Sequence, residues 1–179
     1  NAEDLTDNYK RLPQVSAVWR GDAKLGPLEP LLKLQAANFD TDLDKVKGQR
    51  VYQELGINLP ITRDYGFLNT SLMHRSIQYR LKTPDTSETR NESVSSWLGR
   101  IEGGLEFERD TELFGLSFTQ TLEPRIQYLY AEYDDHAGIP DFDSAELTFS
   151  YRQLFRNTRF SGYDRLADAD QLSLGVTSR

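Results

Sequence analysis

The sequence contains no cysteine and no long hydrophobic run. Without cysteine, the chain has no disulfide, no thiol nucleophile and no cysteine-ligated metal site. Its hydrophobic fraction is 37% and its mean hydropathy is −0.62, and no stretch approaches the roughly 20 apolar residues that a membrane-spanning helix requires. A membrane β-barrel remains open, because the lumen-facing half of its strand residues is polar.

An excess of basic residues is also missing. The formal net charge is −7, which argues against nucleic acid as a partner because phosphate backbones attract basic surfaces. The first residues show no basic stretch followed by an apolar run and a small-residue cleavage site, so we expect any export signal to have been removed or to lie outside this sequence.

What the sequence does contain is a two-residue alternation, clearest in its last third. Such alternation predicts strands with one apolar and one polar face. The apolar positions in this part of the chain include Leu122, Ile126, Tyr128, Leu172, Leu174 and Val176, and the polar ones include Glu123, Arg125 and Gln127.

The same period predicts about eight strands over the whole chain. Short connections between them favour an all-β antiparallel meander. We expect a bulge near residues 73–76, where the apolar phase slips, and a bend at Gly103 and Gly104. Residues 83–96 are polar and predict a solvated loop. The predicted strands are residues 12–20, 30–38, 51–61, 67–81, 97–109, 121–133, 147–152 and 171–177.

The solvent of the apolar face decides the function class. Residues 121–133 extend about 43 Å at about 3.3 Å per residue, close to the roughly 42 Å needed to cross a hydrocarbon core of about 30 Å at about 45°. Length therefore favours a membrane barrel. Pattern alone leaves open a soluble secreted β-sandwich binding module, with sequons at Asn69 and Asn91.

No constellation of residues predicts catalysis, so we expect no enzyme and no cofactor. His74 and His136 are far apart in sequence, and no nucleophile accompanies them. Four acidic residues crowd one loop, but their spacing is not that of an EF-hand, so a solvated acidic turn is expected in place of a metal site. These residues are Asp134, Asp135, Asp141 and Asp143.

One loop motif stands out: Phe160, Gly162, Asp164 and Arg165. Gly162 permits a positive φ, and Asp164 and Arg165 can bond exposed backbone, which predicts an ordered turn. The alternative is a contact with a barrel wall or a plug.

Several short sequence words in fixed order carry a resemblance to a known family. The words are TLEPR at 121–125, YLY at 128–130, IPDFD at 139–143, QLFR at 153–156, RFSG at 159–162 and GVTSR at 175–179. With these words the chain resembles the barrel domain of the LptD family of lipopolysaccharide-assembly outer-membrane proteins, most strongly from about Glu106 onward.

The resemblance implies that residues 1–179 are a single segment of a large outer-membrane β-barrel domain, without the family's periplasmic jellyroll and without its remaining strands, and with the lateral gate elsewhere. It implies a wall segment of the translocon that inserts lipopolysaccharide into the outer leaflet of the Gram-negative outer membrane. The implied partners are lipopolysaccharide, outer-membrane lipid and an LptE-type plug lipoprotein.

Within such a barrel, the alternation assigns each strand residue to lipid or lumen. The expected lipid-facing residues are the six apolar ones given above for the last third of the chain. The expected lumen-facing residues are Arg100, Glu102, Glu106, Glu123, Arg125 and Gln127.

Overall fold

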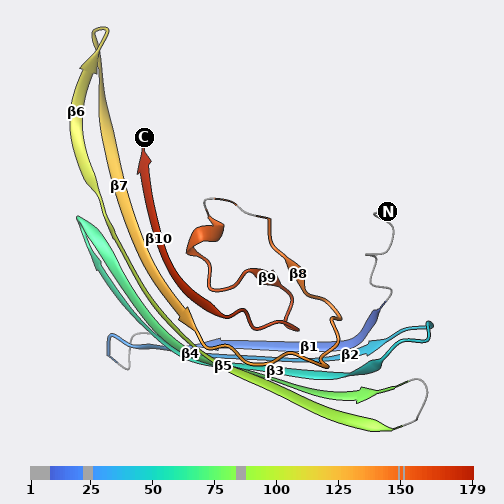
Figure 1. Ribbon diagram of the computed structural model, residues 1–179. Coiled ribbons are helices and arrows are strands. Elements are labelled where there is room, and N and C mark those ends of the chain that lie inside the picture. Colours follow the sequence, from blue (N-terminus) through green and yellow to red (C-terminus); the bar gives the residue numbers. More distant parts are fainter. Residues whose placement is uncertain (1–8, 22–25, 84–87, 149, 151) are drawn as a thin grey trace.

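The computed structural model describes residues 9–21, 26–83, 88–148, 150 and 152–179. They form one curved antiparallel sheet, and a largely irregular segment lies against its concave side (Figure 1). We call the concave side the inner face and the convex side the outer face. The prediction of an all-β antiparallel meander of about eight strands is confirmed.

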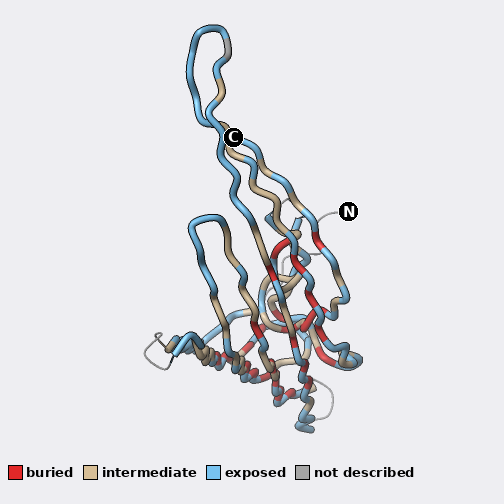
Figure 2. Tube along the Cα trace, turned by 90° about the vertical axis from the view of Figure 1, so that its left-hand side faces the viewer, coloured by how far each residue is buried: buried red, intermediate tan, exposed pale blue. Residues whose placement is uncertain are grey.

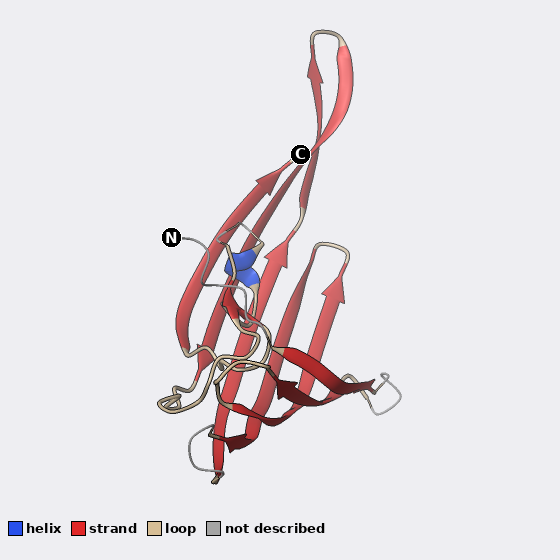
Figure 3. Cartoon of the chain, turned by 90° about the vertical axis from the view of Figure 1, so that its right-hand side faces the viewer, coloured by secondary structure: helices blue, strands red, loops and turns tan. Residues whose placement is uncertain are grey.

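Long strands lie side by side in the main sheet (Figure 3), and they are ordered almost as they follow one another in the chain. The order is β1-β2-β3-β4-β5-β7-β10, and β6 pairs with β7 beyond the end of β5. The bounds are β1 Lys10–Arg20, β2 Glu29–Asp40, β3 Lys47–Arg63, β4 Gly66–Lys82, β5 Thr89–Leu105, β6 Phe107–Leu113, β7 Leu116–Ala131 and β10 Ala169–Ser178.

The central strands are long. β3, β4 and β5 contain 17 residues each, whereas strands in globular domains average about five or six. The β3–β4 pairing runs without interruption from Arg63 opposite Gly66 to Lys47 opposite Lys82. Because the pairing is regular, successive side chains alternate between the two faces along the whole strand.

The β6–β7 hairpin projects beyond the other strands (Figure 1). Leu113 lies opposite Leu116, and the two turn residues, Phe114 and Gly115, have φ values of 52° and 74°. Positive φ at both central residues is the signature of the turn that matches strand twist. β7 therefore begins just after the turn, at Leu116, five residues before the predicted start at residue 121.

The predicted bulge near residues 73–76 is wrong. β4 pairs in unbroken register with both β3 and β5 through this region. The apolar phase slips because the surroundings change along a regular strand. Leu68 and Leu72 are exposed on the outer face, while Ile77, Tyr79 and Leu81 are buried on the inner face.

The predicted loop at residues 83–96 is wrong in its second half, and residues 84–87 lie outside the described residues. β5 begins at Thr89, and Val94 and Ser96 are buried on its inner face. Residues 89–96 are mostly polar, but exposed and buried side chains alternate along residues 93–98. The strand is interrupted at Glu106, whose N–H donates to the carbonyl of Tyr65 at 2.9 Å, just beyond the glycine pair where a bend was expected.

The predicted strand at residues 147–152 is also wrong, although Phe149 and Tyr151 lie outside the described residues. In its neighbourhood the described chain forms a two-residue strand β8 (Ala145–Glu146), which pairs with β9 (Phe160–Ser161), and a 3₁₀ turn η2 (Gln153–Phe155). β10 pairs directly with β7, from Ala169 opposite Ala131 to Ser178 opposite Leu122. Residues 132–168 therefore leave the sheet, and we call them the inner segment.

The buried residues lie in the sheet and in the inner segment (Figure 2), and their apolar side chains form two clusters. The larger of two clusters joins β2–β5 to the inner segment, and the smaller one joins β5 and β7. The larger cluster contains Ala37, Phe39, Tyr52, Ile77, Tyr79, Leu81, Val94, Ile139, Phe142 and Leu166, and the smaller one contains Leu98, Leu129 and Ala131. No helix in the described part of the chain is long and apolar enough to cross a membrane.

Candidate functional site: the two faces of the sheet and the inner segment

The six residues expected to face lipid lie together on the outer face of β7 and β10. Ile126 is opposite Leu174, and Tyr128 is opposite Leu172. The exposed fractions of all six lie between 44% and 66%. The two strands therefore present a continuous apolar strip to whatever surrounds the sheet, and the assignment of that strip to lipid stays a prediction.

Four of the six residues expected to face a lumen are neighbours on the inner face of β5 and β7. Arg125 donates a hydrogen bond to Glu102, and Nη1 of Arg100 is 3.6 Å from Oε2 of Glu102. Gln127 lies opposite Glu102 and is 1% exposed, and neither polar atom of its amide has a hydrogen-bond partner among the described residues.

The other two lie apart from this group. Glu123 is half-buried, and its Oε2 is 3.5 Å from Nη2 of Arg179. Glu106 is exposed at the interruption between β5 and β6. Whether any of the six faces an open lumen stays a prediction.

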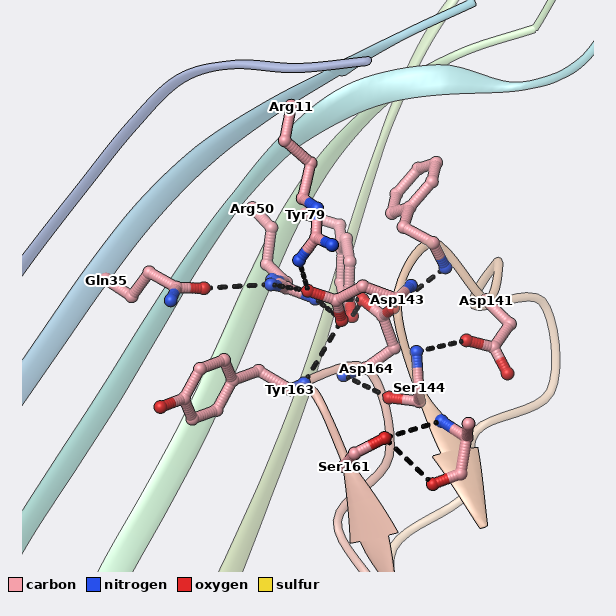
Figure 4. Close-up of polar contacts among 12 residues, drawn as sticks. Arg11, Gln35, Arg50, Tyr79, Asp141, Asp143, Ser144, Ser161, Tyr163 and Asp164 are labelled. Carbon is pink, nitrogen blue, oxygen red and sulfur yellow. Dashed lines mark hydrogen bonds and ion pairs between the residues drawn. The ribbon is translucent and has the colours of Figure 1, made fainter. Parts of the chain in front are cut away.

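The inner segment is fastened to the sheet by a buried ion-pair network around Arg50 of β3 (Figure 4). Nη1 of Arg50 lies 2.7 Å from Oδ1 of Asp143 and 2.5 Å from Oδ1 of Asp164. Nη2 donates to Oδ2 of Asp143 at 2.8 Å and to Oε1 of Gln35 at 2.9 Å. One cation of the sheet thus joins two carboxylates of the inner segment.

Asp164 is fully buried and accepts hydrogen bonds from the sheet and from the inner segment. From the sheet, Tyr79 donates its hydroxyl to Oδ1 at 2.7 Å. From the inner segment, the N–H groups of Phe142 and Asp143 donate to Oδ2 at 2.8 and 2.6 Å. Asp164 therefore satisfies backbone, as the turn interpretation expects, and it also contacts the sheet, as the alternative interpretation expects.

The other members of the loop motif support the same fold of the inner segment. Gly162 has a φ of +70°, and a Cβ there would lie 2.3 Å from the carbonyl oxygen of Asp143, so only glycine fits. Arg165 donates to the carbonyl of Ile139 at 3.3 Å. Phe160 pairs with Glu146 through β8 and β9.

Apolar contacts surround the ion pairs. The rings of Phe39 in β2 and Phe142 in the inner segment are stacked, with centroids 4.4 Å apart and planes inclined by 6°. The guanidinium of Arg50 lies 4.8 Å from the centroid of Phe39. Excluding water in this way strengthens the ion pairs, because the local dielectric falls.

A second contact fastens the inner segment to β7 and β10. The guanidinium of Arg125 lies 4.2 Å from the centroid of Phe155, a cation–π distance. Ser173 of β10 donates its hydroxyl to the carbonyl of Leu154 at 2.8 Å. The 3₁₀ turn therefore covers the polar inner-face group of Glu102, Arg125 and Gln127.

This packing shifts the pKa values of Asp143 and His136 in the inner segment. Burial alone would raise the pKa of the Asp143 carboxyl, but the hydrogen bonds and attraction from Arg50 outweigh burial and hold the pKa below its usual value. Burial lowers the pKa of His136, whose Nε2 accepts a hydrogen bond from the N–H of Leu166 at 3.1 Å.

The acidic loop residues accept hydrogen bonds from backbone N–H groups, and Asp143 also forms ion pairs. Asp134 accepts from the N–H of Ser95 at 2.8 Å, Asp135 from that of Ala137 at 2.8 Å, and Asp141 from that of Ser144 at 2.9 Å. Within the described ranges, no group of three His, Cys, Asp or Glu side chains is placed to hold a metal ion.

The sequence analysis did not identify the residues that make the central contact. Arg50 lies just before the predicted strand 51–61, Tyr79 lies within the predicted strand 67–81, and Asp143 belongs to the expected acidic turn. Asp143 and Asp164 do lie in or beside sequence words that carry the family resemblance, which is a usable signal. Nothing local marks Arg50 as their partner, because 93 and 114 positions separate it from them.

The comparisons with known proteins agree on one family. A family model described as "LptD: LPS transport system D" matches residues 1–179. The chain is 39% identical to the LPS-assembly protein LptD of Alcanivorax borkumensis over 182 residues, which cover 99% of this chain and 24% of that protein. It is 37% identical to the protein of the same name from Pseudomonas aeruginosa strain LESB58, covering 96% of this chain and 22% of the relative.

The protein of that name from Escherichia coli K12 is 36% identical, covering 99% of this chain and 24% of the relative. The chain thus spans about a quarter of the length of the curated relatives it matches. Taken with the all-β fold, the match over the full chain shows that it belongs to the LptD family.

Proposed function

We propose that this chain is a wall segment of an outer-membrane β-barrel that inserts lipopolysaccharide into the outer leaflet. The observation that carries the proposal is the contrast between the two faces of one long-stranded sheet. The outer face exposes a continuous apolar strip. The inner face carries a charged group of Arg100, Glu102 and Arg125, and its apolar side chains are covered by the chain's own inner segment. The whole chain, residues 1–179, is in this proposal a single segment of the barrel domain.

The outer face supports lipid as its surroundings. Large side chains such as Trp97, Ile101 and Ile126 are 50%, 52% and 50% exposed, and they lie on the outer face of the adjacent strands β5 and β7. Soluble monomers rarely expose apolar patches of more than a few hundred Å². In a bilayer the same side chains are favourable, and a strand of 17 residues is long enough to cross the hydrocarbon core obliquely.

The inner face supports an aqueous lumen. Glu102 is paired there with Arg100 and Arg125. Such charges are stable when they are paired with one another or surrounded by polar groups, and they would be costly in lipid. The relatives are named for the assembly of lipopolysaccharide, a phosphorylated glycolipid whose headgroup requires a polar path. We therefore propose lipopolysaccharide as the cargo, an LptE-type lipoprotein as the plug partner and the Gram-negative outer membrane as the site of action.

A transport role without catalysis accounts for the polar groups in the described chain. Asp143 and Asp164 are bound to Arg50, and His136 accepts a backbone hydrogen bond. These groups fasten the inner segment, and none of them activates a nucleophile. We therefore propose that the chain is not an enzyme and needs no cofactor.

The soluble β-sandwich alternative is less well supported. A sandwich needs two sheets packed face to face, whereas the described residues form one large sheet and the two-stranded β8–β9 pair. Both candidate sequons also lie inside paired strands, Asn69 opposite Glu102 and Asn91 opposite Arg80.

Spin labels on the full-length protein in lipid bilayers test the proposal. Labels at Ile126 and Leu174 should be accessible to oxygen, which concentrates in the bilayer, and protected from a water-soluble relaxation agent. A label at Glu123 on the inner face is the matched control and should show the reverse preference. Equal access of the aqueous agent to both faces would contradict the wall assignment and favour the soluble alternative.

A further inference from the structure

A small cavity lies between the inner segment and the inner face, beside the Arg50 network. Its volume is about 190 Å³, enough for about six water molecules at about 30 Å³ each. Strands β2–β5 supply one wall and the inner segment supplies the other. The lining residues are Lys33, Tyr52, Glu54, Met73, Arg75, Leu98, Asn157, Thr158, Gly162, Tyr163, Arg165 and Leu166.

Three of these lining residues are cations without a carboxylate partner. Within the described structure, Lys33, Arg75 and Arg165 form no ion pair, although nine other basic residues do. Glu54 is the one carboxylate in the lining, and it accepts a hydrogen bond from Tyr52. The cavity therefore carries an excess of positive charge.

Arg75 is the strongest sign of a missing anion. It is 5% exposed, and its Nη2 donates to two neutral acceptors at long distances, 3.3 Å to Ser96 Oγ and 3.4 Å to the carbonyl of Ala167. Its Nε is buried without a partner. A buried guanidinium with five N–H donors is costly unless its charge is balanced.

The other two cations are held in place by weak contacts. Nζ of Lys33 lies 4.9 Å from the ring centroid of Tyr163 and 5.7 Å from that of Tyr52. Arg165 donates to the carbonyl of Ile139 at 3.3 Å. Both therefore keep donors for a further ligand. Arg50 does not contribute to the excess, because Asp143 and Asp164 neutralise it.

We propose that this cavity binds a phosphate group, either as free inorganic phosphate or carried on a small sugar. Guanidinium and ammonium groups that line one small, partly open cavity suit a tetrahedral oxyanion. A hydrogen phosphate also carries an O–H, which can be donated to Glu54 or to Oδ1 of Asn157, a buried acceptor without a partner. The volume excludes a lipid with several acyl chains. The proposal stands on these contacts and does not depend on the wall function.

Calorimetric titration of the full-length protein in detergent tests the site, with inorganic phosphate in one arm and glucosamine 1-phosphate in the other. Arg75→Gln and Lys33→Gln should each weaken binding at least about tenfold, because a hydrogen bond to a charged group is lost. Arg80→Gln removes an exposed outer-face charge and should leave binding unchanged. Lys33→Gln keeps the test valid if the buried Arg75 variant does not fold.

Each outcome decides the matter. Binding of inorganic phosphate alone, weakened by the variants, identifies a free ion, and stronger binding of the sugar phosphate identifies a group carried on a sugar. No binding in either arm would overturn the proposal. Binding that Lys33→Gln and Arg165→Gln leave unchanged would also overturn it, because the anion would then lie elsewhere.

Discussion

The two ends of β4 place their apolar side chains on opposite faces. Toward the start of the strand, Leu68 and Leu72 are exposed on the outer face, and toward its end Ile77 and Leu81 are buried on the inner face. Ile77 and Leu81 pack against the inner segment, through residues such as Phe142. Leu68 and Leu72 are covered by no described segment of the chain on the outer face, and we propose that lipid surrounds them.

The face of a strand that carries its apolar residues can therefore change along the strand, because it depends on which side has an apolar neighbour at each position. Alternation in the sequence does not assign one face of the whole strand to the interior. The predictions below disturb the inner contact and the outer strip separately, in order of decreasing effect.

The largest effect is expected from Arg50→Ala. The substitution leaves Asp164 buried without its cation, and Asp143 keeps only Arg11 of β1, whose Nη1 lies 3.2 Å from its Oδ2. Breaking a buried ion pair in this way costs about 3–5 kcal/mol. The inner segment should detach, measured as faster proteolytic cleavage within residues 132–168 of the full-length protein and as a lower unfolding midpoint.

Arg80→Ala is the matched control, because Arg80 is an exposed arginine on the neighbouring strand. Adding Asp164→Asn to Arg50→Ala should recover part of the loss by removing one uncompensated charge. Wild-type resistance to proteolysis in the Arg50 variant would refute the role given to this network.

Ile126→Lys and Leu174→Lys come next, and they act on the outer strip. If these positions face the middle of a bilayer, each lysine should destabilise the folded barrel by about 2–4 kcal/mol. Urea unfolding of the full-length protein in lipid vesicles measures the change. Glu123→Lys places the same side chain on the inner face, and an equal loss there would reverse the assignment of faces.

Gly162→Ala should destabilise the contact by about 1–3 kcal/mol, because the residue adopts a left-handed conformation and the new Cβ would overlap the carbonyl of Asp143. Thermal unfolding measures the loss. Gly99→Ala is the control: nothing lies within 4 Å of a Cβ built there, so its effect should be near zero. Equal melting temperatures for the two variants would contradict the fold given to this turn.

The smallest effect is a pH dependence through His136. Burial lowers the pKa of this imidazole in the folded state, so the unfolded chain binds its proton first. The contribution is fully present above the ordinary pKa of about 6.5 and declines as the pH falls from there through the folded pKa. The protection factor of the Leu166 N–H, which corrects its exchange rate for the intrinsic pH dependence, should fall over this interval, and His136→Gln should remove this fall.

Much of the sheet could be predicted because its cause is local. In β7 and β10, alternation of Leu122, Ile126 and Leu174 with Glu123 and Arg125 follows directly from strand geometry. The polar first half of β5 was taken for a loop because Ser93, Ser95 and Ser96 have the composition of one. Its position in the sheet depends on partners in β4 that no local pattern names.

The inner contact could not be predicted, because its partners are distant in sequence. Asp164 was marked by its turn and by the family resemblance, but an arginine on a strand reads as solvated unless its neighbours are known. The strand predicted at residues 147–152 failed for the same reason. The strand stops after Glu146, which pairs with Phe160, and the N–H of Leu147 donates one more bond to the carbonyl of Arg159 at 2.8 Å.

The pairing of Ala131 with Ala169 has a consequence for how this family can vary. The inner segment leaves the sheet and returns to it at two adjacent positions, so the ladder of hydrogen bonds closes behind it. Insertions or deletions within residues 132–168 would leave the register of β7 and β10 unchanged. Evolution can therefore remodel what occupies the concave side while the strands around it keep their alignment.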